Sequence, residues 1–196
     1  MKQATKQSRG ERLMTARVIM AALALGWASS AGAQFPASGQ TTSVRAADDG
    51  DLEAGATLSY TDNGDGTITD NNTGLQWEKK SDDGTIHDKD NIYTWEEAFA
   101  VHVAGLNTEP CFSGHCDWRV PNVKELQSIV NYGVPFPGPV VSPAFNNNCV
   151  GATVLTGSCT AASLYWSATT GAGNRARRRS PNFAWFVGFV GGSVRG

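Results

Sequence analysis

Acidic residues are missing from the last third of this 196-residue chain. Glu125 is the last Asp or Glu, and every charged side chain beyond it is an arginine. Without residues 1–33 the chain keeps eleven basic and seventeen acidic residues, a net charge of −6. A basic region on an acidic protein creates a local positive field. The acidic total argues against nucleic acid as a partner.

The sequence also lacks the motifs of common hydrolases and metalloproteases. It contains no Gly-x-Ser-x-Gly nucleophile elbow and no His-Glu-x-x-His zinc helix. Its three histidines, His87, His102 and His115, have no evident nucleophile or base partner in the sequence, and His102 is predicted at the edge of the core. These absences favour a protein that is not an enzyme.

The apolar stretch at residues 18–27 is too short to span a bilayer as a stable helix. A basic segment precedes it, and the small residues Ala-Gly-Ala follow at 31–33, an arrangement typical of a secretory signal peptide. Residues 1–33 are therefore predicted as a signal peptide. The mature protein is predicted to be exported, to the periplasm, the cell surface or the exterior, and to have no membrane span.

Export makes the four cysteines informative, because they would meet an oxidising compartment. Three pairings are possible. Cys111 with Cys116 and Cys149 with Cys159 is favoured, since each pair brackets a short loop rich in Gly, Ser or Asn. A zinc site is the competing interpretation, but the spacings match no common zinc ribbon or finger.

Composition divides the mature chain into a linker and a domain. Residues 34–56 are small and polar without apolar periodicity, which predicts a flexible linker before a domain at 57–196. Residues 57–80 read as a short strand, a Gly-rich loop and a hairpin with its turn at 71–74. Ile68 lies on one arm of this hairpin, and Leu75 and Trp77 on the other.

The Gly-rich loop at residues 61–70 resembles half of an EF-hand calcium loop. When Gly66 is aligned with the obligatory glycine, Thr61 occupies a position that normally holds Asp, and Asn72 replaces the bidentate Glu. A two-carboxylate site of this kind would bind calcium weakly, and a plain Asx/Gly turn is the alternative. The calcium candidates are Asn63, Asp65, Thr67 and Asp70, with Thr69 at a further ligand position.

Two capping boxes predict helices. Thr94 with Glu97 opens one, and Asn122 with Glu125 opens the other, each followed by apolar residues at helical spacing. Residues 117–120, just before the second helix, alternate as in a half-buried strand.

The charged residues at this junction have an architectural interpretation. Asp117, Arg119 and Glu125 are predicted to form a network that pins the strand to the helix.

Residues 132–163 are rich in Pro, Gly and Asn and predict a long loop region. Two aromatic strands follow, at 164–169 and 184–190, with apolar residues on both faces, as in central strands. Between them lie Arg175, Arg177, Arg178 and Arg179.

Six blocks, in this order, resemble the collagen-like-protein C-terminal (Lcl C-terminal) domain family of bacterial exported proteins: NGDGTITDNNTGLQW, YTWEEAFAV, HCDWRVPNVKELQSIVN, SPAF, YWSATT and AWFVGFVGG. The resemblance covers about residues 58–192. It implies an α+β, C-type-lectin-like fold with two helices packed on a twisted antiparallel sheet and a long irregular loop region. Family members usually have one more strand after the glycines at 191–192, so the domain is expected to lack its last strand. That absence implies a fragment, a frameshift or an open sheet edge.

For the best-studied members the resemblance also implies adhesion to sulfated glycans such as glycosaminoglycans, although most members have no assigned activity. No collagen-like tract precedes the domain in this sequence. The resulting hypothesis is an exported, non-catalytic binding module. The residues expected to bind sulfate or carboxylate groups of a polyanionic glycan, each guanidinium bonding two oxygens at once, are Arg175, Arg177, Arg178 and Arg179.

Three alternatives remain open. In the first, the arginine-bearing loop only aids solubility. The protein can instead be a structural, envelope-associated interaction module without a small ligand. It can also be an oxidase, because formylglycine-generating oxidases share the lectin-like fold, although they use a reactive thiol pair.

Overall fold

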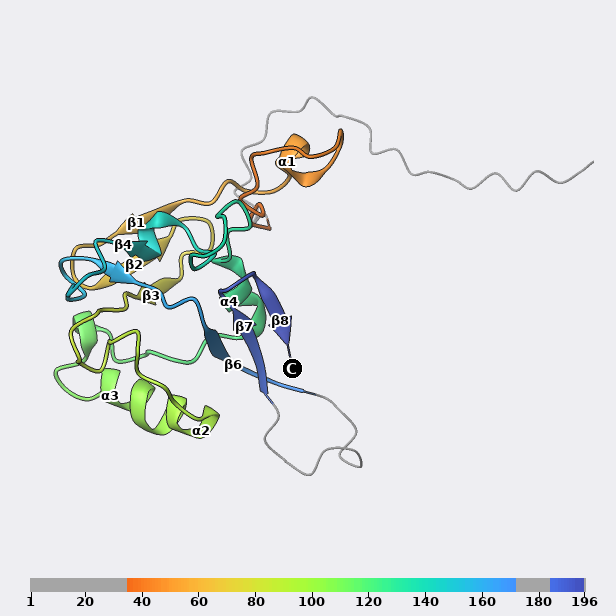
Figure 1. The fold of residues 1–196 in the computed structure, drawn as a ribbon. Coiled ribbons are helices and arrows are strands. Elements are labelled where there is room, and N and C mark those ends of the chain that lie inside the picture. Colours follow the sequence, from red (N-terminus) through yellow and green to blue (C-terminus); the bar gives the residue numbers. More distant parts are fainter. Residues whose placement is uncertain (1–34, 172–183, 196) are drawn as a thin grey trace, which may run out of the picture. The chain divides into compact units, whose positions relative to one another are not determined.

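The computed structural model describes residues 35–171 and 184–195, which form short helices and small antiparallel sheets (Figure 1). The α+β class predicted from the sequence is confirmed. The predicted signal peptide and the arginine-bearing segment lie outside the described residues. Within the described residues, no helix combines the length and apolar character that crossing a membrane requires.

The first sheet holds strands β1 (Tyr60–Asp62), β2 (Thr67–Asp70) and β3 (Gln76–Glu78), in that order. Ile68 on β2 is fully buried and pairs with Trp77 on β3. The tight loop between β1 and β2 turns at Gly64 and Gly66, whose φ values of 77° and 96° suit glycine. The predicted strand, loop and hairpin are therefore confirmed.

The helix that begins after Thr94 changes character along its length. It comprises α2 (Trp95–Glu97), the π-helix η1 (Ala98–Val103) and α3 (Ala104–Leu106). Thr94 accepts a hydrogen bond from the Glu97 N–H, and the Glu97 carboxylate accepts one from the Thr94 N–H. The predicted capping box is thus confirmed, and it fixes where the helix starts.

Helix α4 (Val123–Ser128) also begins at its predicted capping box, formed by Asn122 and Glu125. Glu125 binds Arg119 through two parallel contacts of 2.8 Å each. These contacts confirm the predicted link between the helix and the segment before it. Asp117 takes no part in the link among the described residues.

Residues 117–120 are not a strand, contrary to the sequence-based prediction. The side-chain amide of Asn107 donates to the Trp118 carbonyl and accepts from the Trp118 N–H, both at 2.9 Å. One side chain therefore takes the two backbone groups that a neighbouring strand would have paired. A period-two pattern reveals the alternating burial of side chains but not which partner pairs the backbone.

The C-terminal sheet contains β6 (Leu164–Thr170), β7 (Ala184–Gly188) and β8 (Ser193–Arg195), again in chain order. Val187 pairs with Val194, so β7 is the middle strand of this sheet and residues 193–195 form a short strand beside it. Gly192 has φ of 69°, which allows a turn tight enough for three residues to return along β7.

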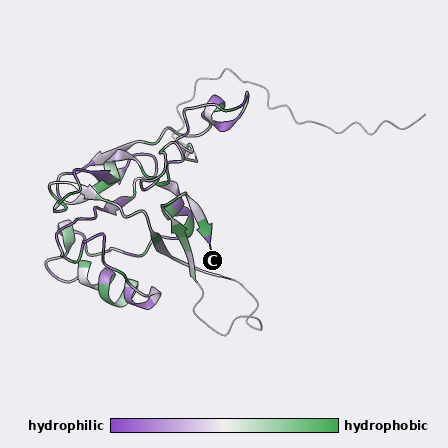
Figure 2. Ribbon diagram, viewed as in Figure 1, coloured by the Kyte–Doolittle hydropathy of each residue, from purple (hydrophilic) through white to green (hydrophobic). Residues whose placement is uncertain are grey.

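The core joins the two larger sheets through α4. Ile68 comes from the first sheet, Leu126 and Ile129 from α4 and its C-terminal end, and Val187 and Phe189 from the C-terminal sheet and the turn after it. The loop region 132–163 contributes Val140, Val141 and Phe145, the last from the 3-10 helix η3 (Pro143–Phe145). Figure 2 shows apolar positions along β6, β7 and β8.

The same loop region carries a small two-stranded sheet, β4 (Asn146–Asn147) with β5 (Ser158–Cys159). Disulfides join Cys111 to Cys116 and Cys149 to Cys159, with Cα–Cα distances of 5.1 and 5.0 Å. The favoured pairing is therefore confirmed. The first bridge closes over the 3-10 helix η2 (Phe112–Gly114).

Residues 35–56, which the composition predicted as part of a flexible linker, have defined backbone contacts. They contain the short helix α1 (Asp49–Leu52), and Pro36 forms a bridge with Ala56. The Tyr132 N–H donates to the Ser38 carbonyl at 2.8 Å. This segment is thereby attached to the loop region that begins at 132.

Candidate functional site

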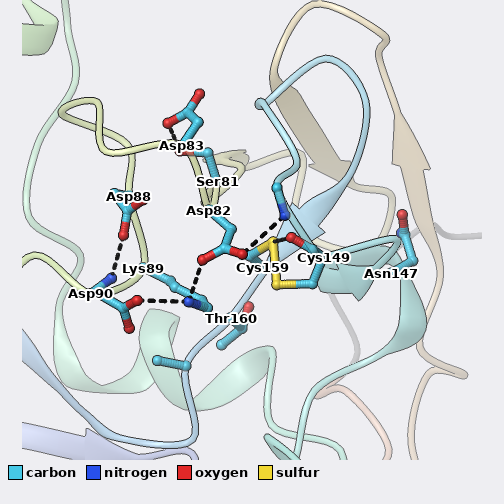
Figure 3. Close-up of a disulfide and its surroundings, with 12 residues drawn as sticks. Ser81, Asp82, Asp83, Asp88, Lys89, Asp90, Asn147, Cys149, Cys159 and Thr160 are labelled. Atoms are coloured by element: carbon cyan, nitrogen blue, oxygen red, sulfur yellow. Dashed lines mark hydrogen bonds and ion pairs between the residues drawn. A yellow bond between two sulfur atoms is a disulfide. The ribbon is translucent and has the colours of Figure 1, made fainter.

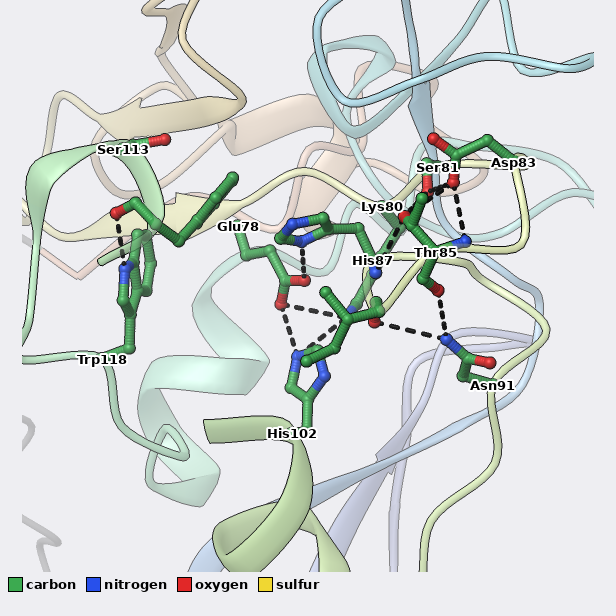
Figure 4. Close-up of polar contacts among 12 residues, drawn as sticks. Glu78, Lys80, Ser81, Asp83, Thr85, His87, Asn91, His102, Ser113 and Trp118 are labelled. Carbon is green, nitrogen blue, oxygen red and sulfur yellow. Dashed lines mark hydrogen bonds and ion pairs between the residues drawn. The ribbon is translucent and has the colours of Figure 1, made fainter. Parts of the chain in front are cut away.

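The carboxylate of Glu78, the last residue of β3, gathers three basic side chains around it (Figure 4). Lys80 Nζ lies 2.9 Å from Oε2, and His102 Nε2 lies 2.8 Å from the same oxygen. His87 Nδ1 lies 2.8 Å from Oε1. The Glu78 side chain is only 11% exposed, so these contacts replace the water that a carboxylate otherwise requires.

Burial alone raises the pKa of Glu78, but the charge of Lys80 and the hydrogen bonds from His102 and His87 outweigh it. The net pKa lies well below the usual range for glutamate. Glu78 is therefore ionised at neutral pH and is not a proton donor there.

His102 reaches Glu78 from the π-helix η1. Its Nε2 lies 2.8 Å from the Glu78 carboxylate and 3.2 Å from Lys80 Nζ. Its Nδ1 is buried and has no hydrogen-bond partner among the described residues, and the same holds for Trp77 Nε1. The Tyr93 ring lies 5.3 Å from the imidazole, and burial, with Glu78 nearby, raises the pKa of Tyr93.

A cavity of about 830 Å³ lies beside this cluster. Its walls come from β3, the loop 88–93, the helix 95–106, the segment 117–121 and β6. Trp118 and Trp166 line it, and each indole N–H is bound to a backbone carbonyl, of Phe112 at 3.1 Å and of Tyr93 at 2.9 Å. The aromatic walls are therefore held in fixed orientations.

The loop after β3 is attached to the second disulfide (Figure 3). Lys89 Nζ lies 2.6 Å from Asp82 and 2.7 Å from Asp90. The other oxygen of Asp82 accepts from the Gly151 N–H, inside the loop that Cys149 and Cys159 close. Asp82, Asp88 and Asp90 lie close enough together for a metal, but the Lys89 ammonium already supplies positive charge there.

The calcium candidates occupy two places. Asp65 accepts from the Thr67 N–H at 2.9 Å and from its hydroxyl at 2.6 Å, and the Asn63 amide donates to Thr67 at 2.8 Å. Asp70 lies at the other end of β2, where it accepts from the Asn72 N–H and the Thr73 hydroxyl. The structure thus brings Asn63, Asp65 and Thr67 into one turn and places Asp70 in another.

The tripeptide Asp-Gly-Thr occurs twice, at 65–67 and 83–85, and forms the same turn in both places. Asp83 accepts from the Thr85 N–H and hydroxyl, as Asp65 does from Thr67. In both copies the aspartate oxygen therefore stabilises the turn.

Two histidine predictions need correction. His87 and His102 do have an acidic partner, Glu78, which sequence reasoning missed. The partners lie nine and 24 residues away from Glu78, in separate elements, so no local spacing connects them. His115 instead packs edge-on against Trp118, with ring centroids 6.1 Å apart.

The predicted glycan-binding residues lie outside the described residues: Arg175, Arg177, Arg178 and Arg179. The described ends of the connection that carries them are paired, Thr170 with Ala184. The structure therefore fixes where this connection leaves and rejoins the sheet.

A comparison with family models matches the Lcl C-terminal domain to residues 66–196, more than half of the chain. The chain belongs to the Lcl C-terminal domain family. Comparisons with curated proteins and with solved structures find no match. In this Lcl C-terminal domain, Glu78, its three partners and the whole cavity lining fall within the matched residues, whereas β1 precedes them. The family resemblance read from the sequence is confirmed.

Proposed function

We propose that this Lcl C-terminal domain is an exported, non-catalytic binding module for polyanionic glycans and that its fold is of the C-type-lectin-like kind. The proposed contact residues are Arg175, Arg177, Arg178 and Arg179. One observation carries the proposal: most basic side chains elsewhere in the domain are already paired with acids.

The described basic residues divide into two groups. Four are in ion pairs of 2.6–2.9 Å: Lys79 with Asp62, Lys80 with Glu78, Lys89 with Asp82, and Arg119 with Glu125. Arg45, Lys124 and Arg195 make no ion pair with a described acid, and they are far apart in sequence. A paired charge attracts a distant anion weakly, because its partner cancels much of its field.

The four arginines fall within five consecutive positions, and the chain offers no acid beyond Glu125. A sulfated or carboxylated polymer presents repeated anionic groups, each of which a guanidinium can bind through two parallel hydrogen bonds. The paired strand ends at Thr170 and Ala184 anchor this segment on both sides. A polyanion is therefore a better match than a single small anion.

A non-catalytic role is supported by two features of the described residues. The Glu78 carboxylate already binds three partners, and its lowered pKa leaves it a poor proton carrier at neutral pH. All four cysteines are in disulfides, whereas an oxidase of the formylglycine-generating kind needs a reactive thiol pair. Two disulfides also support export to an oxidising compartment.

Chromatography on immobilised heparin tests the proposal. The triple variant R177S/R178S/R179S is compared with R45S/K124S/R195S, which removes the same number of charges at exposed positions elsewhere. We expect the first variant to elute at clearly lower salt than the native protein, and the second to elute close to the native value, because pairing with sulfate is screened by salt.

Equal elution of both variants would contradict the role of the arginines. Failure of the native protein to bind heparin at low salt would instead favour the structural, envelope-associated interaction module.

A further inference from the structure

The cavity beside Glu78 is lined by several polar side chains that have no described hydrogen-bond partner. Three of its polar side chains, those of Tyr93, His115 and Asp117, make no hydrogen bond or ion pair with any described residue. Asp117 and His115 adjoin Trp118, and Tyr93 adjoins Trp166 through the indole bond to its carbonyl. Trp118 and Trp166 therefore each have a polar side chain without a described hydrogen bond beside them.

We propose that this cavity binds a neutral sugar ring. The proposal uses none of the arginines at 175–179 and does not rest on the proposed function. A sugar ring has apolar C–H faces that pack on aromatic side chains, and hydroxyl groups that both donate and accept hydrogen bonds. Pockets that hold such ligands combine aromatic walls with a few polar groups, within the range of about 300–1,000 Å³.

The charges around the cavity favour a neutral ligand over an anionic one. Glu78 is paired with Lys80, Arg119 with Glu125, and Lys89 with Asp82 and Asp90. Asp88 also lines the cavity without a described ion pair, but its carboxylate accepts from the Gly84 and Asp90 N–H groups. Among the described lining carboxylates, that of Asp117 has neither an ion pair nor a hydrogen bond. A sulfate or carboxylate would face this negative charge, whereas two neighbouring hydroxyls can donate to it.

The aromatic walls are already oriented before any ligand arrives. Trp166 is 37% exposed at the cavity rim, its N–H is bound to the Tyr93 carbonyl, and its ring meets Phe186 edge-on at 5.9 Å. The Trp95 N–H donates to the Ser167 carbonyl at 2.9 Å and so attaches the helix 95–106 to β6. Orientation of the wall in advance lowers the entropy cost of binding.

Saturation-transfer difference NMR on the full mature chain tests the proposal. The probes are methyl α-D-glucoside, methyl α-D-mannoside, methyl β-D-galactoside and N-acetyl-D-glucosamine, each at about 10 mM, because a single ring is expected to bind in the millimolar range. D-glucuronic acid serves as the anionic comparison. We expect signals from at least one neutral sugar and a much weaker signal from the glucuronate.

Matched variants locate the site. W166A and D117A should each weaken binding about fivefold or more. The controls are W185A, on the adjacent strand β7 and outside the cavity lining, and E53A, at an exposed acid in the segment 35–56. Both controls, and the arginine variant R177S/R178S/R179S, should bind as the native protein does.

Three results would overturn the proposal: no signal from any of the four neutral sugars, an equal signal from glucuronate, or unchanged binding in both W166A and D117A. Thermal unfolding by circular dichroism shows whether W166A is folded. If it is not, D117A alone decides, because Asp117 is exposed and its side chain makes no hydrogen bond or ion pair with a described residue. Loss of heparin binding in the arginine variant, with sugar binding intact, would separate the two proposals.

Discussion

Among single substitutions that remove one charge and keep the shape of the side chain, Glu78→Gln should destabilise the domain most. The side chain keeps its shape, so no cavity forms, but Lys80 and two imidazoles lose the charge that compensates their burial. Removing one partner of a buried ion pair costs about 3–5 kcal/mol. Against a total stability of about 5–15 kcal/mol for a domain, that is a large fraction.

Urea unfolding followed by circular dichroism, with the disulfides intact, measures this difference. In a thermal scan we expect E78Q to unfold about 10 °C lower than the native protein, from about 2–4 °C per kcal/mol at this chain length. The control is R119Q, which breaks a bidentate pair whose arginine side chain is 57% exposed and should cost about 1 kcal/mol or less. A loss below about 1 kcal/mol for E78Q would refute the reasoning.

The stability difference between the native protein and E78Q should depend on pH, in a direction set by the lowered pKa of Glu78. The folded pKa of Glu78 is lowered, so its stabilising contribution is present above the unfolded value of about 4.3 and is lost as pH falls through the folded pKa. The stability difference between the native protein and E78Q should therefore be full near pH 7 and shrink in acid below about pH 4. A difference that stays constant down to pH 3 would contradict an ionised Glu78.

Three further outcomes follow from local geometry, each measured by urea unfolding. G66A should cost about 1–3 kcal/mol, because Gly66 has φ of 96° and an added Cβ would meet Phe112 at 2.9 Å. G64A should cost about 1 kcal/mol, because Gly64 has φ of 77° but open space around it. Equal losses of stability in the two variants would contradict the contact with Phe112. N107A should cost about 2 kcal/mol through its two bonds to the Trp118 backbone. C149A/C159A should cost about 2–3 kcal/mol, from a loop of ten residues.

The elements that sequence predicts well are those whose signals are local. Thr94 and Asn122 cap helices because the capping box needs only residues three positions apart. The hairpin of β2 and β3 was predictable because its turn residues lie between two short alternating runs. Such patterns depend on residues close together in the sequence and need no tertiary contact.

Predictions failed where distant residues decide the structure. The backbone of Trp118 is paired by the side chain of Asn107, which no alternation pattern reveals. The cluster at Glu78 combines a strand, a loop and a π-helix, and the cavity has walls from segments spread between residues 74 and 189. A buried carboxylate with two imidazoles is thus a property of the folded chain and not of any sequence window.

Strand β6 carries the aromatic rim of the cavity at Trp166 and ends at Thr170, where the chain leaves toward the arginines. An insertion or deletion within β6 would therefore shift the rim of the cavity and the start of the connection to β7 together, because one strand carries both.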